Sequence, residues 1–272
     1  MIKKRGLPLG WYPQGADEVR LICDEWNQLC DGPREGIAAI VPHAGWYYSG
    51  ATAFKGIHSM IENLDVLVVA GGHLSSQAPI HLGHFEAVET PLGDVNIHRE
   101  LFNVIAQTFP TVPDSVADNS VEIQLPLIKY LYPNAKILWV RLPPNELALQ
   151  FGHKLGQEAR TRGIAIGFVG STDLTHYGDN YGFSPVQEVE KGLTWMRDVN
   201  DKKVISSLIS MDGKGSITLA MDDNSACSIG AAAGAVTFAK QLGIKEGHLV
   251  EYLTSYDRTP SSSFVGYAAI SF

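Results

Sequence analysis

The sequence predicts an α/β fold in which a central, mostly parallel or mixed sheet is flanked by helices. Short apolar runs of four to seven residues alternate with segments of helical length and periodicity. A chain of 272 residues with 45% hydrophobic and 18% charged residues is long enough for one large domain with a sizeable core. No repeat, low-complexity tract or Pro/Gly-rich linker divides it, so we expect a single domain over residues 1–272.

The first predicted element is an amphipathic helix over residues 16–29. Its apolar residues recur three and four positions apart, which places them on one helical face: Val19, Ile22, Cys23, Trp26 and Leu29. We interpret Cys23, and Cys30 just beyond it, as packed or loosely exposed helix thiols without a chemical role.

Buried strands are predicted next, at 37–41, 64–70, 137–142 and 164–169, where the runs show little polar alternation. Helices are expected between them, at 49–61, 100–109, 122–131 and 147–162. Towards the C-terminus the pattern predicts helices at 186–210 and 225–242 and strands at 249–255 and 264–272. This βα alternation is what a parallel sheet covered by helices requires.

Composition excludes several classes of protein. The chain has 21 Lys and Arg against 29 Asp and Glu, and its longest basic run is residues 3–5, so we expect no nucleic-acid partner. No stretch approaches the roughly 18 apolar residues of a membrane span, and no signal peptide is readable, so we expect no membrane partner and a cytoplasmic location. Three cysteines without a C-x-x-C pair exclude a disulfide scaffold and a structural zinc site of several thiolates.

Histidines follow three of the predicted strands. His43 comes after the first strand, His73 after the second, and Asp173 and His176 after the fourth. The carboxyl ends of strands in an open α/β sheet form the ligand crevice, so these side chains are predicted to converge there. The expected partner is therefore a small-molecule substrate or ligand.

Cys227 is a further candidate for this site. We expect it in the first turn of the helix 225–242, behind capping side chains at 222–224, where the helix dipole lowers a thiol pKa. It is then suited to act as a nucleophile or a metal ligand. The alternative is that it is a small residue packed in an Ala- and Gly-rich helix.

Two imidazoles and one anionic ligand that leave coordination positions open are typical of non-haem Fe(II) enzymes. A thiolate in place of the carboxylate shifts the preference towards copper or zinc. Ligand type therefore does not settle the metal, and we expect Fe(II) first, with Cu or Zn as alternatives. A nearby His or Asp that does not bind the ion would act as acid or base.

Six short motifs follow one another along the chain: Pro42–Gly50 (similar to PHAGY-x-Y-x-G), Gly72-His73-x-Ser75 (GPSHH), Thr90–Asp94 (TPLGD), Ser120–Pro126 (SIEVQLP), Ser171–Gly178 (SSD-x-x-H-x-G) and Ala226-Cys227. Together they resemble the motifs of the Memo family, also called AmmeMemoRadiSam system protein B in bacteria and archaea. The chain departs from the family pattern at Leu74, Asn119 and Ser228, and Gly71-Gly72 replaces a Gly-Pro pair.

The resemblance implies a fold like that of the class III extradiol dioxygenases. It also implies that His43, His73 and Cys227 bind a metal, iron or copper with redox roles, and that Asp173 and His176 form the acid/base pair.

Three functions remain open from the sequence. The first is a non-haem Fe(II) oxygenase of the extradiol type, acting on an aromatic diol-like substrate with His176 moving protons and Asp173 orienting it. The second is a non-catalytic protein that binds iron or copper, or a ligand or peptide in the same pocket. The third is a metal-assisted or cysteine-nucleophile hydrolase, with Cys227 activated by His176.

Overall fold

The computed structural model describes residues 1–272 and is built around a nine-stranded sheet. The strand order is β10-β12-β2-β9-β3-β8-β4-β7, with β11 paired to β12. The strands are β2 (Ala38–Val41), β3 (Val66–Gly71), β4 (Ile80–Leu82), β7 (Thr111–Pro113), β8 (Lys136–Arg141), β9 (Ile166–Ser171), β10 (His176–Tyr177), β11 (His248–Thr254) and β12 (Phe264–Ser271).

The centre of the sheet is parallel and its edges are mixed. Strands β2, β9, β3 and β8 run parallel, whereas β12 is antiparallel to β2, and β4 is antiparallel to β8. Val41 lies opposite Ser171, and Gly71 lies opposite Arg141, so these strands end along one line. The predicted α/β class with a mostly parallel or mixed sheet is confirmed.

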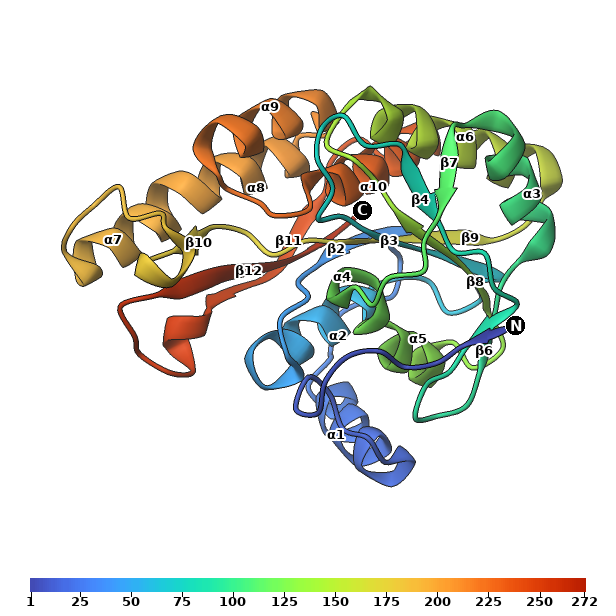
Figure 1. Ribbon diagram of the computed structural model, residues 1–272, viewed down its shortest axis with the longest axis horizontal. Coiled ribbons are helices and arrows are strands. Elements are labelled where there is room, and N and C mark those ends of the chain that lie inside the picture. Colours follow the sequence, from blue (N-terminus) through green and yellow to red (C-terminus); the bar gives the residue numbers. More distant parts are fainter.

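Helices cover both faces of the sheet (Figure 1). On one face α10 packs against β9, β2 and α6, and on the other α2 packs against β2 and β12, with α1 and α5 beside it. The helices are α1 (Ala16–Gln28), α2 (Ala51–His58), α3 (Arg99–Thr108), α4 (Asn119–Glu122), α5 (Leu125–Leu131), α6 (Glu146–Arg162), α7 (Val189–Trp195), α8 (Asp201–Ile209), α9 (Gly213–Asp223) and α10 (Ile229–Gln241). None of them is both long enough and apolar enough to span a bilayer.

Small residues allow α10 to lie close to α6. A Cβ added at Gly152 in α6 would overlap the carbonyl oxygen of Gly234 in α10. The two backbones are therefore in direct contact, and α10 is buried along almost its whole length. This close packing fixes where the segment just before α10 meets the sheet.

Some elements were not predicted because they are short. A separate three-stranded sheet joins β1 (Ile2–Lys3), β5 (Ala87–Val88) and β6 (Val95–Asn96), each only two residues long. Strands β4 and β7 have three residues each, and α9 lacks a strong apolar stripe. Strands of two or three residues carry too few residues to show a periodicity, and α9, which has 11 residues, carries no clear apolar pattern.

Two predicted helices have different boundaries. The expected helix 186–210 is divided into α7 and α8 by a π-helical turn, Met196–Asn200, which brings Asn200 and Asp201 together into the interior. The expected helix 225–242 begins only at Ile229, because α9 occupies the chain up to Asp223 and Asn224 ends it in the left-handed conformation. Residues 225–228 are a connection between helices.

Candidate metal centre

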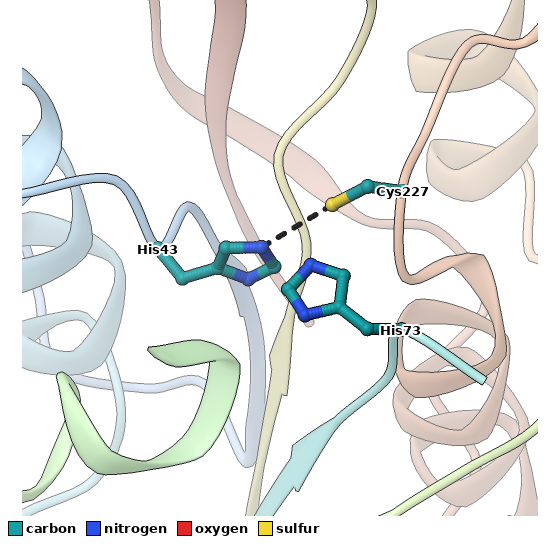
Figure 2. Close-up of side chains that lie close together, drawn as sticks. All are labelled: His43, His73 and Cys227. Atoms are coloured by element: carbon teal, nitrogen blue, oxygen red, sulfur yellow. Dashed lines mark hydrogen bonds between the residues drawn. The ribbon is translucent and has the colours of Figure 1, made fainter. Parts of the chain in front are cut away.

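Three predicted ligands meet at the carboxyl edge of the sheet. His43 lies two residues beyond β2, His73 two residues beyond β3, and Cys227 on the connection between α9 and α10. One donor atom of each lies within 4.8 Å of the others, and Cys227 Sγ is 3.2 Å from His43 Nε2 (Figure 2). Two imidazoles and a thiol facing one point form a donor set that suits Fe, Cu or Zn, so these residues fit a transition-metal ion.

His43 is buried and held at both its backbone and its ring. Its N–H donates to Asp173 Oδ1 at 2.6 Å, and its Nδ1 lies 3.1 Å from Ser171 Oγ. Gln124 Nε2 donates to the same serine oxygen at 3.1 Å and to the Pro42 carbonyl at 2.7 Å. With Nδ1 occupied, Nε2 is the nitrogen left to face Cys227.

His73 reaches the site through an unusual backbone conformation. Its φ is 56°, in the left-handed region that non-glycine residues rarely adopt. Its Nδ1 lies 3.2 Å from Asp118 Oδ2, and its ring meets the His43 ring edge to face at a centroid distance of 4.9 Å. In Figure 2 its other ring nitrogen points towards Cys227 Sγ.

Cys227 precedes α10 and is not in the first turn of a helix, so its predicted position was wrong. The lowering of its pKa that we expected from a first-turn position in the helix dipole therefore does not apply. Its N–H donates to the Asp173 carbonyl at 3.2 Å, and the N–H of Ser228 donates to Thr172 Oγ1 at 3.0 Å. These bonds tie the connection to the loop after β9 and delay the start of α10. Tertiary contacts, rather than a helix terminus, place the thiol.

The two imidazoles make the thiol acidic. Burial raises the pKa of Cys227, but the adjacent His43 and His73 outweigh burial and lower this pKa well below its ordinary value. Burial also opposes protonation of His73, yet the hydrogen bond that its ring donates to Asp118 and the nearby thiolate raise its pKa to about 10. Both shifts favour a thiolate beside an imidazolium when no metal is bound, and the thiolate is the form that binds metals.

Asp173 and His176 lie beside the three ligands but do not form the expected pair. Asp173 is buried, which raises its pKa, and its carboxylate contacts His43 rather than His176. His176 instead packs edge-on against Tyr181, with ring centroids 4.9 Å apart. The orientation of His176 therefore comes from an aromatic contact and from its place at the start of β10.

A cavity of about 540 Å³ opens over the site. Hydroxyl-bearing side chains line much of it, and none of its lining residues is Lys or Arg. Its walls include His43, His73, Asp173, His176, Trp11, Tyr48, Asn119, Tyr181, Ser255, Thr259, Ser261, Ser263 and Tyr267. The volume is that of a small-molecule pocket.

Several residues that support His73 were not predicted from the sequence. Asp118, Asp114 and Arg141 form a buried charged network behind His73. Arg141 ends strand β8 directly after the buried apolar residues 137–140, and a buried charge at such a position indicates a buried partner. His81 contacts this arginine (Nδ1 to Nη2, 3.2 Å) and does not join the three ligands, while His84 packs on Phe102.

Comparison with known proteins agrees with the motif resemblance. Residues 9–271 match the Memo-like protein family. A MEMO1 family protein of Thermococcus onnurineus is 30% identical, with 100% of this chain and 99% of that protein covered. One from Archaeoglobus fulgidus is 31% identical, covering 96% of each.

Among solved structures, an uncharacterized protein of Escherichia coli K12 matches with a TM-score of 0.46 at 12% identity, over 86% of this chain and 99% of that one. The family match covers nearly the whole sequence, and the resemblance found in the motifs is confirmed. The chain belongs to the Memo-like protein family.

Proposed function

We propose that this protein is a metal-binding enzyme, a non-haem Fe(II) oxygenase or redox enzyme that acts on a small, aromatic diol-like substrate. The observation that carries the proposal is the convergence of His43, His73 and Cys227, two of which, His43 and His73, line a small-molecule cavity. His43 and His73 offer imidazole nitrogens and Cys227 offers sulfur, so these three residues would hold the ion. Copper and zinc suit the same donors.

The chemistry that an Fe(II) ion supplies when bound by three protein ligands is activation of O₂ together with a chelating substrate. In an extradiol-type reaction both atoms of O₂ enter the ring-opened product, so no external reductant is consumed. The chain's own residues must bind the diol, keep bulk water away and move its protons.

His176 is the residue best placed to move those protons. It lines the cavity without belonging to the cluster of three donors, so its imidazole is free to accept a hydroxyl proton and return it later. Tyr181 holds one side of its ring, which limits the directions in which it can turn. The aromatic walls formed by Trp11, Tyr48 and Tyr267 suit a flat substrate ring.

A second candidate is a protein that binds iron or copper without turnover. The observation in its favour is the sulfur ligand, because a thiolate holds soft ions such as Cu(I) more tightly than a carboxylate does. The hydrolase alternative assigns the activation of Cys227 to His176, whereas the imidazole hydrogen-bonded to Cys227 Sγ is that of His43.

The test compares metal content and oxygen uptake after anaerobic reconstitution with Fe(II). We expect about one ion per chain in the wild type and none in His43→Ala, His73→Ala or Cys227→Ala, as for a three-ligand site. His176→Ala should keep the ion and lose oxygen uptake with a catechol panel. The matched control is His153→Ala, at an exposed histidine on α6.

Each result separates the candidates. Tight metal binding with no oxygen uptake across the panel would favour the non-catalytic protein. Oxygen uptake that survives in His176→Ala would refute the role assigned to that histidine. Absence of a specific ion in the wild type would refute both metal-based functions.

A further inference from the structure

The left-handed backbone of His73 requires support from its surroundings. A residue with a Cβ and φ of 56° is strained, and such strain persists only where neighbouring contacts hold it. The side chain itself is one-third exposed to the cavity, so packing alone does not fix the ring. On the side of the ring that faces away from Cys227, His73 Nδ1 makes a polar contact with Asp118 Oδ2.

Asp118 is held at both carboxylate oxygens. Oδ1 accepts from the N–H of Ser120 at 3.0 Å and from the hydroxyl of the same serine. Oδ2 accepts from Arg141 Nη1 at 3.0 Å and lies 3.2 Å from His73 Nδ1. The carboxylate is buried, with 8% of the residue exposed, so its orientation is determined by these partners.

Arg141 is fixed in turn by Asp114. Its Nε and Nη2 donate to the two oxygens of Asp114 at 3.0 and 2.9 Å, and Trp139 Nε1 donates to the same carboxylate at 2.7 Å. Arg141 Nη1 also approaches the carbonyl of Gly72, next to His73, at 3.4 Å. A planar guanidinium held by all of these partners is a rigid support for the Asp118 carboxylate.

We propose that Asp118 is a positioning residue that fixes the ring of His73, with Nδ1 on the carboxylate and Nε2 directed to Cys227 and the metal. Asp114 and Arg141 hold Asp118 in place. The metal part of this inference rests on the proposed function. Carboxylates that accept from the second nitrogen of a ligating histidine set its tautomer and orientation and strengthen metal binding.

The simpler explanation of Asp118 is structural, because its side chain also caps α4. Two substitutions separate these roles. Asp118→Ser keeps an oxygen that can cap the helix but is too short to reach His73. In Asp118→Asn, Arg141 favours the side-chain orientation in which the amide oxygen faces the arginine, so this oxygen can still accept from His73. The amide NH₂ then faces the N–H of Ser120, and the helix cap is lost.

The experiment uses the full-length chain with Co(II) and with Zn(II) as probes. In Asp118→Ser we expect Co(II) affinity to fall by about 10- to 100-fold, and in Asp118→Asn to fall much less. In Zn(II)-loaded wild type, ¹⁵N shifts of His73 should show Nε2 on the metal and a proton on Nδ1. In the metal-free wild type, NOEs between the His43 and His73 rings should report their 4.9 Å contact, and they should weaken in Asp118→Ser.

The inference is overturned if Asp118→Ser retains both wild-type Co(II) affinity and the ring NOEs, or if Asp118→Asn loses affinity as severely as Asp118→Ser. Metal bound through Nδ1 of His73 would also overturn it. If the wild type binds neither probe, the proposed function fails, and the metal-free ring NOEs alone decide whether Asp118 positions His73.

Discussion

Cys227 Sγ lies 3.2 Å from His43 Nε2, although 184 residues separate them in the chain. The contact joins the end of a central strand to the connection before the most buried helix. Together with the neighbouring His73, this contact lowers the pKa of the thiol, and the thiolate is the form that binds metals.

Replacing Cys227 should change which metals bind. Cys227→Ser substitutes a hard hydroxyl for a soft thiolate, so affinity for Cu(I) and Zn(II) should fall more than affinity for Fe(II). Competition titrations with each ion measure this, and the sulfur-to-cobalt charge-transfer band of the Co(II) form should disappear. Cys23→Ser, at a buried thiol outside the site, serves as control. A charge-transfer band that remains in Cys227→Ser would exclude Cys227 as a ligand.

Metal affinity should weaken as the pH falls. In the metal-free protein the pKa of His73 is raised to about 10, so at neutral pH the imidazole carries a proton that the ion must displace. Each displaced proton changes affinity by about tenfold per pH unit, and below about pH 6, where ordinary imidazoles also protonate, the ion should be lost. Calorimetry in buffers of different ionisation enthalpy counts the released protons. Affinity that is constant between neutral pH and pH 6 would contradict this protonation state.

Asp201 should make the fold less stable as the pH rises. It is fully buried, accepts from the N–H of Thr175 at 3.1 Å and from Tyr252 Oη at 2.8 Å, and burial raises its pKa to about 7. Between the unfolded pKa of about 4 and the folded value, the native state binds the extra proton. Stability from this group is therefore complete below about pH 4 and declines through pH 7, by up to about 1.4 kcal/mol per pH unit.

Asp201→Asn imitates the protonated acid and should remove that decline. Urea unfolding at several pH values measures the difference between the two proteins. We expect the free energy of unfolding of the variant, relative to that of the wild type, to increase steadily from about pH 4 to pH 7. Parallel profiles would show that Asp201 does not titrate in this range.

The contact between α6 and α10 should not tolerate a methyl group. Gly152→Ala places a Cβ against the Gly234 carbonyl, and overpacking of this kind costs about 1–3 kcal/mol, more than the helix propensity that alanine gains. Urea unfolding tests this against Gly15→Ala, at a glycine with open space around it. Equal stability of the two variants would mean that the helices can move apart freely.

The sequence determines the fold class and most of the site. Buried parallel strands need apolar residues on both faces, so β2, β3, β8 and β9 are visible as continuous apolar runs. Parallel strands end at one edge of a sheet, and this rule brings His43 and His73 together without knowledge of the remaining topology. Three of the family motifs, Pro42–Gly50, Gly72-His73-x-Ser75 and Ser171–Gly178, lie at the ends of β2, β3 and β9, and the motifs together agree with the comparison of whole sequences.

The tertiary structure decides the contacts that pass between distant segments. Cys227 is placed by bonds to the loop after β9, Asp173 turns to His43 across 130 residues, and Asp118 reaches His73 only because Arg141 lies in the neighbouring strand. Such hydrogen bonds depend on side-chain direction and on which strands are neighbours, and neither follows from local periodicity. The sequence therefore places the candidate ligands at one edge of the sheet, while packing determines which atoms face one another there.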